Sequence, residues 1–245
     1  MAAPEFEKLA INQATTMEQW TLREAIEGYA ASDIRGISIW RDKLAECGVD
    51  EAAKILADHG MTVTGLCRGG MFPANDAAGR RAALDDNRRA VDEAAAIGAQ
   101  CLIMVCGGLP DGSKDMIDAR KQVEDGLAAM LPHARDAGVP VAIEPLHPMT
   151  AADRACVNTM EHALDLCDAL GDGIGVAVDC YHVWWDPKLE GQIARAGDRI
   201  LGFHVCDWLV PTVDLGSRHD GRRCHRHSAY PRLGRSSGLS RIQRS

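Results

Sequence analysis

Short apolar runs alternate with longer segments of helical periodicity up to about residue 208. The strand candidates are Leu9–Gln13, Gly36–Trp40, Thr62–Cys67, Cys101–Cys106, Val139–Leu146, Gly175–Cys180 and Ile200–Cys206. Between them the pattern predicts helices at about residues 21–32, 50–60, 77–97, 114–137, 158–170 and 187–198. This alternation is typical of repeated βα units around a parallel sheet.

Glycines at the ends of the predicted helices support the same organisation. Gly60, Gly98 and Gly138 each follow a predicted helix, where a left-handed residue commonly ends the last turn. No strand leads into the Gly-x-Gly-x-x-Gly turn of a dinucleotide-binding fold, and Cys106-Gly107-Gly108 is too short to replace it. We therefore expect a (βα)8 TIM barrel with about seven βα units and an irregular last unit.

Composition narrows the class of protein. The 245 residues are 46% hydrophobic, enough for one large core, but no run approaches the ~20 apolar residues of a membrane span. The chain start lacks the order of a signal peptide, and the nine cysteines form no Cys-x-x-Cys pair, so we expect a cytoplasmic protein with reduced thiols and no cysteine nucleophile. A net charge of −8 and 4% aromatic residues disfavour a nucleic-acid partner.

Three consecutive strand candidates end in strong metal ligands. Glu144, Asp179 and His204 each follow an apolar strand run, at the carboxyl edge where barrel enzymes place their chemistry. Each alone could be a helix cap, an ion-pair partner or a hydrogen-bonded core histidine. Their shared position in successive units favours a metal site, and this donor set suits Mn²⁺ first, with Mg²⁺, Co²⁺ or Zn²⁺ as alternatives.

The motifs Glu144-Pro, Asp179-x-x-His182 and His204-x-x-Asp207 resemble the sugar phosphate isomerase/epimerase superfamily, whose barrel is xylose isomerase-like. The resemblance covers about residues 8–215. It implies a divalent ion bound by Glu144, Asp179, His204 and a final Glu on an eighth strand. It also implies the isomerisation or epimerisation of a small sugar or keto-sugar, phosphorylated or not, through an enediolate.

The same resemblance implies individual roles. Glu144 would be both ligand and general base, His182 would contact the substrate, and Asp207 would orient a histidine from behind the ligands. Two further residues are candidates for the substrate pocket. Arg68 could hold an anionic or polyhydroxy substrate or form a surface ion pair, and His147 could line the pocket.

The last part of the chain departs from this pattern. Residues 216–245 hold eight Arg and one acid, a net charge of +7, whereas residues 1–215 carry −15. No Glu follows Glu190, so the fourth ligand is absent. We therefore divide the chain into a barrel domain, 1–215, and an aberrant Arg-rich tail, 216–245, that we expect to be disordered.

The tail has three alternative explanations. It could be a basic nucleic-acid arm, or Cys224, His225 and His227 could bind zinc. Neither explains why the barrel pattern stops abruptly. Read one nucleotide downstream, the codons of residues 219–228 can encode Met-Met-Gly-Asp-Gly-Val-Ile-Asp-Ile-Pro, which resembles the family at this point. We favour this frame shift, which places the activity of the chain in question.

Two other functions remain open. An apurinic-endonuclease-like metal phosphodiesterase would need histidines on strands two and three, which here end in Trp40 and in Cys67-Arg68. An inactive or basic-tailed binding protein is the alternative outside enzymes. A small-molecule sugar is the expected partner, and a homo-oligomer is allowed. The sequence leaves open the sugar, the stereochemical outcome and the metal.

Overall fold

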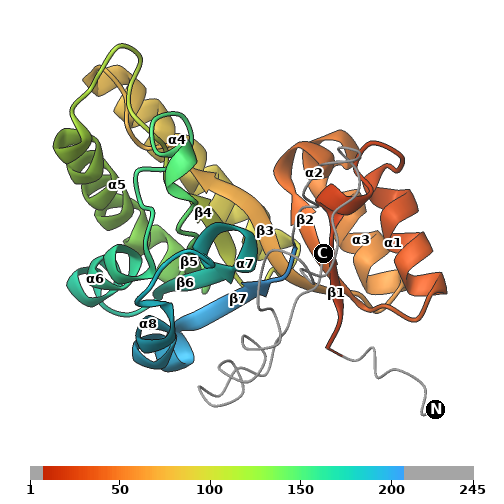
Figure 1. Cartoon of the computed structure of the whole chain (residues 1–245). Coiled ribbons are helices and arrows are strands. Elements are labelled where there is room, and N and C mark those ends of the chain that lie inside the picture. Colours follow the sequence, from red (N-terminus) through yellow and green to blue (C-terminus); the bar gives the residue numbers. More distant parts are fainter. Residues whose placement is uncertain (1–7, 207–245) are drawn as a thin grey trace.

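The computed structural model describes residues 8–206, which form one parallel sheet with its strands in sequence order (Figure 1). The strands are β1 (Ala10–Asn12), β2 (Gly36–Trp40), β3 (Thr62–Gly70), β4 (Leu102–Val105), β5 (Val141–Ile143), β6 (Ile174–Asp179) and β7 (Ile200–His204). Each strand pairs with the next, and the described sheet has β1 and β7 as its edges. The result is the TIM-barrel-like half-barrel of seven strands that the alternating pattern predicts.

Helices lie outside the curved sheet (Figure 1). They are α1 (Leu22–Ala31), α2 (Arg41–Cys47), α3 (Val49–Asp58), α4 (Ala77–Ala96), α5 (Met116–Asp136), α6 (Met160–Leu170), α7 (Cys180–Val183) and α8 (Leu189–Ala196). Short 3-10 turns occur at Gln13–Thr15, Pro148–Thr150 and Gly197–Arg199. The six predicted helices are present. The sequence pattern missed α2 and α7, which begin directly after β2 and β6 and are too short to show a clear period.

The three glycines predicted to end helices do so. Gly60, Gly98 and Gly138 have φ values of 60°, 63° and 69°, in the left-handed region. Each follows α3, α4 or α5 and turns the chain into the next strand. These turns keep the connections short, so that all seven strands run in the same direction.

Two apolar layers flank the sheet. The larger packs the helices against one face of the strands, with residues such as Ile39, Met104 and Val178. The smaller consists of residues on or next to the strands, Cys67, Cys101, Ile103, Ala142 and Ala177, with Trp40 and Leu201 packed against them. Because side chains alternate along a strand, this second set faces the concave interior. The interior is therefore filled below the carboxyl edge.

Strand β5 is shorter than predicted. The apolar run predicts Val139–Leu146, but the strand spans Val141–Ile143. Beyond it the amide of Glu144 still donates to the Met104 carbonyl at 3.1 Å, whereas the amide of Leu146 donates to the Val157 carbonyl at 3.1 Å. The backbone thus leaves the sheet after Glu144 to pair with its own loop, which places Glu144 at the rim.

Several predictions lie outside the described residues. These are the domain boundary at residue 215, the Arg-rich segment 216–245 and Asp207. Across residues 8–206, no helix has both the length and the apolar character that a bilayer crossing requires.

The end of β3 depends on one buried amide. Asn87 of α4 accepts from the Gly70 amide at 2.6 Å and donates to the Gly70 carbonyl at 2.7 Å. Gly70 has φ 112°, and a Cβ there would meet the Val105 carbonyl oxygen at 1.9 Å, so only glycine fits this close approach. Asn87 therefore fixes the strand end that carries Arg68.

We expect Asn87→Ala to lower the free energy of unfolding by about 2–4 kcal/mol, because it leaves two buried backbone groups without partners. Urea denaturation followed by circular dichroism measures the loss. The exposed Asn75→Ala is the matched control and should change stability by less than about 0.5 kcal/mol. Equal effects of the two substitutions would show that the bonds to Gly70 contribute little.

Candidate metal centre

Asp179 and His204 are the last residues of neighbouring strands. They are direct partners in the register between β6 and β7, so their Cα atoms lie side by side. Both strands are apolar up to these residues, as parallel strands covered on both faces must be. Asp179 is 9% exposed and His204 is 5% exposed. The pairing of the two strands thus brings a carboxylate and an imidazole together at one buried edge.

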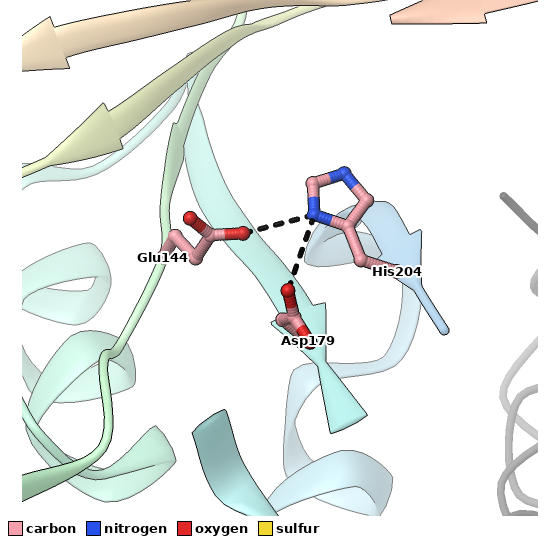
Figure 2. A group of neighbouring side chains, drawn as sticks. All are labelled: Glu144, Asp179 and His204. Carbon is pink, nitrogen blue, oxygen red and sulfur yellow. Dashed lines mark hydrogen bonds and ion pairs between the residues drawn. The ribbon is translucent and has the colours of Figure 1, made fainter. Parts of the chain in front are cut away.

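Glu144 reaches the same point from β5. It is 7% exposed, and its Oε1 lies 2.9 Å from Nδ1 of His204. The same imidazole nitrogen lies 3.9 Å from Oδ2 of Asp179. Figure 2 shows both carboxylates directed at the His204 ring. The three residues that the strand-end pattern singles out therefore converge.

The pKa of Glu144 reflects two opposing influences. Burial raises it, but the hydrogen bond and the charge of His204 outweigh burial, so that the pKa lies below its ordinary value. His182 and Arg154 lower it further by smaller amounts. Glu144 is therefore held as a carboxylate at neutral pH.

The pKa of Asp179 shifts the other way. Burial raises it most, and the negative charge of Glu144 raises it further. The Tyr181 amide donates to Oδ1 at 2.7 Å, and the Cys206 thiol donates to the same atom at 3.7 Å. These contacts hold Asp179 in place at the start of α7, but the pKa remains above its usual value. The two carboxylates repel one another across the site.

The donor set fits a divalent cation. One ligand atom from each of Glu144, Asp179 and His204 lies within 4.8 Å of the others. Since metal–oxygen and metal–nitrogen bonds are ~2.0–2.3 Å long, ligands of a single ion lie at most about 4.5 Å apart, so small side-chain shifts suffice. A divalent ion would also neutralise the two carboxylates that burial disfavours. It is the one such cluster within residues 8–206.

His182 and His147 lie next to this centre. His182 influences the pKa of both Glu144 and Asp179, and it lies three residues after Asp179, in α7. The His147 amide donates to Nδ1 of His182 at 3.2 Å. His147 in turn stacks on Trp184, with ring centroids 6.4 Å apart, and meets Trp185 edge-on at 5.9 Å. The two tryptophans thus form a wall with His147 beside the centre and do not belong to the apolar core.

Arg68 lies on β3 at the same edge of the sheet. It makes no ion pair with any carboxylate within residues 8–206. The surface ion pair that was the alternative role of Arg68 is therefore not found among those residues. Buried thiols of the described chain are poor nucleophiles. Burial raises the pKa of Cys67 and Cys106 far above the usual range, and that of Cys167 to about 11.

Sequence reasoning missed two residues near the centre. Cys206 contacts Asp179 through its thiol, and Arg154, in the loop after β5, acts electrostatically on Glu144. Cys206 could have been found from its position two residues after His204 on the same strand end. Nothing in the sequence around Arg154 marks it, because a loop has no period that would show which way its side chains point.

Comparison with known proteins agrees with this geometry. The family described as xylose isomerase-like TIM barrel matches residues 24–230, most of the chain. The crystal structure of protein SMc04130 from Sinorhizobium meliloti 1021 is 55% identical to this chain, with a TM-score of 0.94, and the match covers 98% of this chain and 89% of that one.

Two more distant relatives carry functional names. The inosose isomerase of Bacillus velezensis is 22% identical over 207 residues, 82% of this chain and 72% of the relative. The structure of the IOLI protein with a bound zinc atom is 21% identical with a TM-score of 0.78, over 97% of this chain and 87% of that one. The chain belongs to the xylose isomerase-like TIM barrel family.

Proposed function

We propose that this protein is a divalent-metal-dependent isomerase or epimerase of a small keto-sugar. The observation that carries the proposal is the convergence of Glu144, Asp179 and His204 within 4.8 Å at the carboxyl edge of the sheet. The names of an inosose isomerase and of a zinc-binding relative support the same assignment. Mn²⁺ remains our first choice of ion, because two carboxylates and one imidazole form a hard to borderline donor set.

A divalent ion bound at this centre would supply a Lewis acid for the carbonyl and neighbouring hydroxyl oxygens of the sugar, and so stabilise an enediolate. Glu144, Asp179 and His204 would hold it. The role of the protein is then to keep these donors deprotonated and to move one proton between carbons or between faces of one carbon.

Glu144 is suited to carry that proton. Its Oε1 is engaged by His204, and the same contact keeps the carboxylate ionised despite its burial. The second oxygen would accept the proton from the carbon next to the carbonyl. Returning it to the neighbouring carbon gives isomerisation, and returning a proton to the opposite face gives epimerisation with a second acid.

His182 is suited to bind the sugar oxygens. Because Nδ1 accepts the His147 amide at 3.2 Å, the neutral ring carries its proton on Nε2. That nitrogen would donate to a hydroxyl or carbonyl oxygen of the substrate. His147 fixes this tautomer through its backbone and lines the pocket with its ring, which gives both histidines a role in substrate binding.

The phosphodiesterase alternative has less support. It would need additional metal ligands at the ends of β2 and β3, but these ends carry Trp40 and Arg68. The Trp40 indole donates to the Asn12 side chain at 2.8 Å, and an indole N–H offers no lone pair to a metal.

Metal binding is the first test. Titration of the full chain with Mn²⁺ in a calorimeter should give one weak site, because these residues supply three protein ligands and no Glu follows Glu190. Glu144→Gln, Asp179→Asn and His204→Gln should each lower the affinity at least tenfold, as loss of a ligand removes charge or a lone pair. The exposed Asp198→Asn serves as the carboxylate control.

The same titration has a defined pH dependence. Metal binding requires the ionised form of Asp179, whose pKa is raised, so affinity is full above that pKa and falls as the pH drops through it. The decline should begin at a higher pH than for an ordinary aspartate. Affinity that increases on acidification, or is indifferent to all three substitutions, would contradict the site.

Proton transfer is the second test. With Mn²⁺ in deuterated water, the full chain should exchange the proton next to the carbonyl of a ketose such as D-fructose only slowly, because the final Glu ligand is absent, and NMR measures the rate. Glu144→Gln should reduce the rate by about 10²–10⁴-fold, since it removes the general base. Glu190→Gln, an exposed carboxylate of α8, should leave it unchanged. Exchange that survives in Glu144→Gln would assign the base elsewhere.

The tail gives a further expectation. A chain whose codons from residue 219 onward are read one nucleotide downstream should bind Mn²⁺ more tightly and exchange faster than the 245-residue chain, because it regains a final Glu ligand. The comparison of the two proteins in the same assays measures this. Equal rates in both would show that the tail is no defect.

A further inference from the structure

The loop between β5 and α6 crosses the carboxyl end of β4 and is held there by its backbone. The Gly107 amide donates to the Arg154 carbonyl at 3.0 Å, and the Cys156 amide donates to the Gly107 carbonyl at 2.9 Å. Gly107 and Ala155 thereby form a short parallel bridge. We call the opening at the carboxyl edge of the sheet the mouth of the half-barrel. Arg154 is therefore anchored at this mouth by its main chain, whereas its side chain is exposed.

Glycine makes this close crossing feasible. A Cβ on Gly107 would lie 2.6 Å from Cδ of Pro73, and one on Gly108 would lie 2.4 Å from the Ala152 carbonyl oxygen. Both positions are too crowded for any side chain. The Cys106-Gly107-Gly108 sequence thus has a structural purpose: it lets the loop that carries Arg154 lie directly on the strand end.

Arg154 acts electrostatically on two groups at this edge of the sheet. It acts on Glu144, beyond β5, and on Cys67, which faces the concave interior from β3. The end of β4 lies between β3 and β5 in the sheet, so a loop held there is placed between Cys67 and Glu144. The main chain of Arg154 is therefore at the same edge of the sheet as the metal centre, although its side chain is exposed.

This arginine has no partner of opposite charge in the described part of the chain. Other arginines, such as Arg41 and Arg195, form ion pairs with Asp or Glu, but neither Arg154 nor Arg68 does so within residues 8–206. Arg154 cannot assist a divalent cation, since the two charges repel. A negatively charged group on the substrate itself would give Arg154 a partner of opposite charge.

We propose that Arg154, together with Arg68 at the end of β3, forms a subsite for an anionic group of the substrate, a phosphate or a carboxylate on a keto-sugar. The proposal rests on the proposed function for the sugar part and adds the charge class of the substrate. A guanidinium pairs with either anion through two parallel hydrogen bonds, so both groups fit the same chemistry.

Equilibrium binding to the metal-free full chain tests it, because an anion cannot then bind the ion instead. The probes are D-fructose, D-fructose 6-phosphate and 5-keto-D-gluconate, which are neutral, phosphorylated and carboxylated. Wild type should bind one of the two anionic probes at least tenfold more tightly than D-fructose. Whichever anion is preferred identifies the group.

Arg154→Gln should remove this preference and leave the affinity for D-fructose unchanged, and Arg154→Lys should retain part of it. Arg35→Gln is the matched control, because Arg35 is an exposed arginine directly before β2, at the amino edge of the sheet opposite the mouth, and should have no effect. Arg68→Gln should also lower the affinity for the preferred anionic probe.

Two results would overturn the subsite: no preference for either anion in wild type, or an equal loss for neutral and anionic probes in Arg154→Gln. Thermal unfolding of each variant confirms that it is folded, so a loss of binding is not a loss of structure. Because no metal and no turnover enter the measurement, its failure is separate from a failure of proton exchange.

Discussion

The burial of two carboxylates at the end of adjacent parallel strands is the constraint on which the centre depends. Strand register fixes Asp179 beside His204, and β5 ends where Glu144 can reach the same imidazole. Two like charges ~4 Å apart repel by about 4 kcal/mol at an effective dielectric of 20, and burial adds its own cost. Within the chain His204 relieves Glu144, which leaves Asp179 with the raised pKa.

A bound cation would relieve that imbalance. An arrangement designed only for stability would pair each buried carboxylate with its own donor or replace it by an apolar residue. Here one imidazole serves two carboxylates, at 2.9 and 3.9 Å. A divalent ion would satisfy both at once, and the hydrogen bond between Glu144 and His204 would give way to shared coordination. The centre therefore holds its ligands in a state that binding would relieve.

Much of this could be predicted from the sequence, because it follows from periodicity. Strands buried on both faces appear as apolar runs, and the residue that ends each run lies at the carboxyl edge, which is how Glu144, Asp179 and His204 were found. Strand length could not be predicted for β5, since Leu146 is apolar for a reason other than pairing: its amide bonds to Val157 in the loop. Arg154 was missed because its place depends on a long-range contact with Gly107, which no local pattern reveals.

The opposite charges of the metal centre and of the proposed arginine subsite link the centre to the charge of the substrate. Glu144 and Asp179 would repel an anionic substrate, whereas a subsite of Arg154 and Arg68 would attract one. Such a subsite would orient the ligand with its anionic group at the arginines and its neutral carbonyl end toward Glu144. A substrate that carried its charge at the reacting end would meet the carboxylates first. The proposed subsite therefore favours a keto-sugar whose anionic group is remote from the carbon that loses its proton, so that binding energy gained at the arginines positions the reacting carbon.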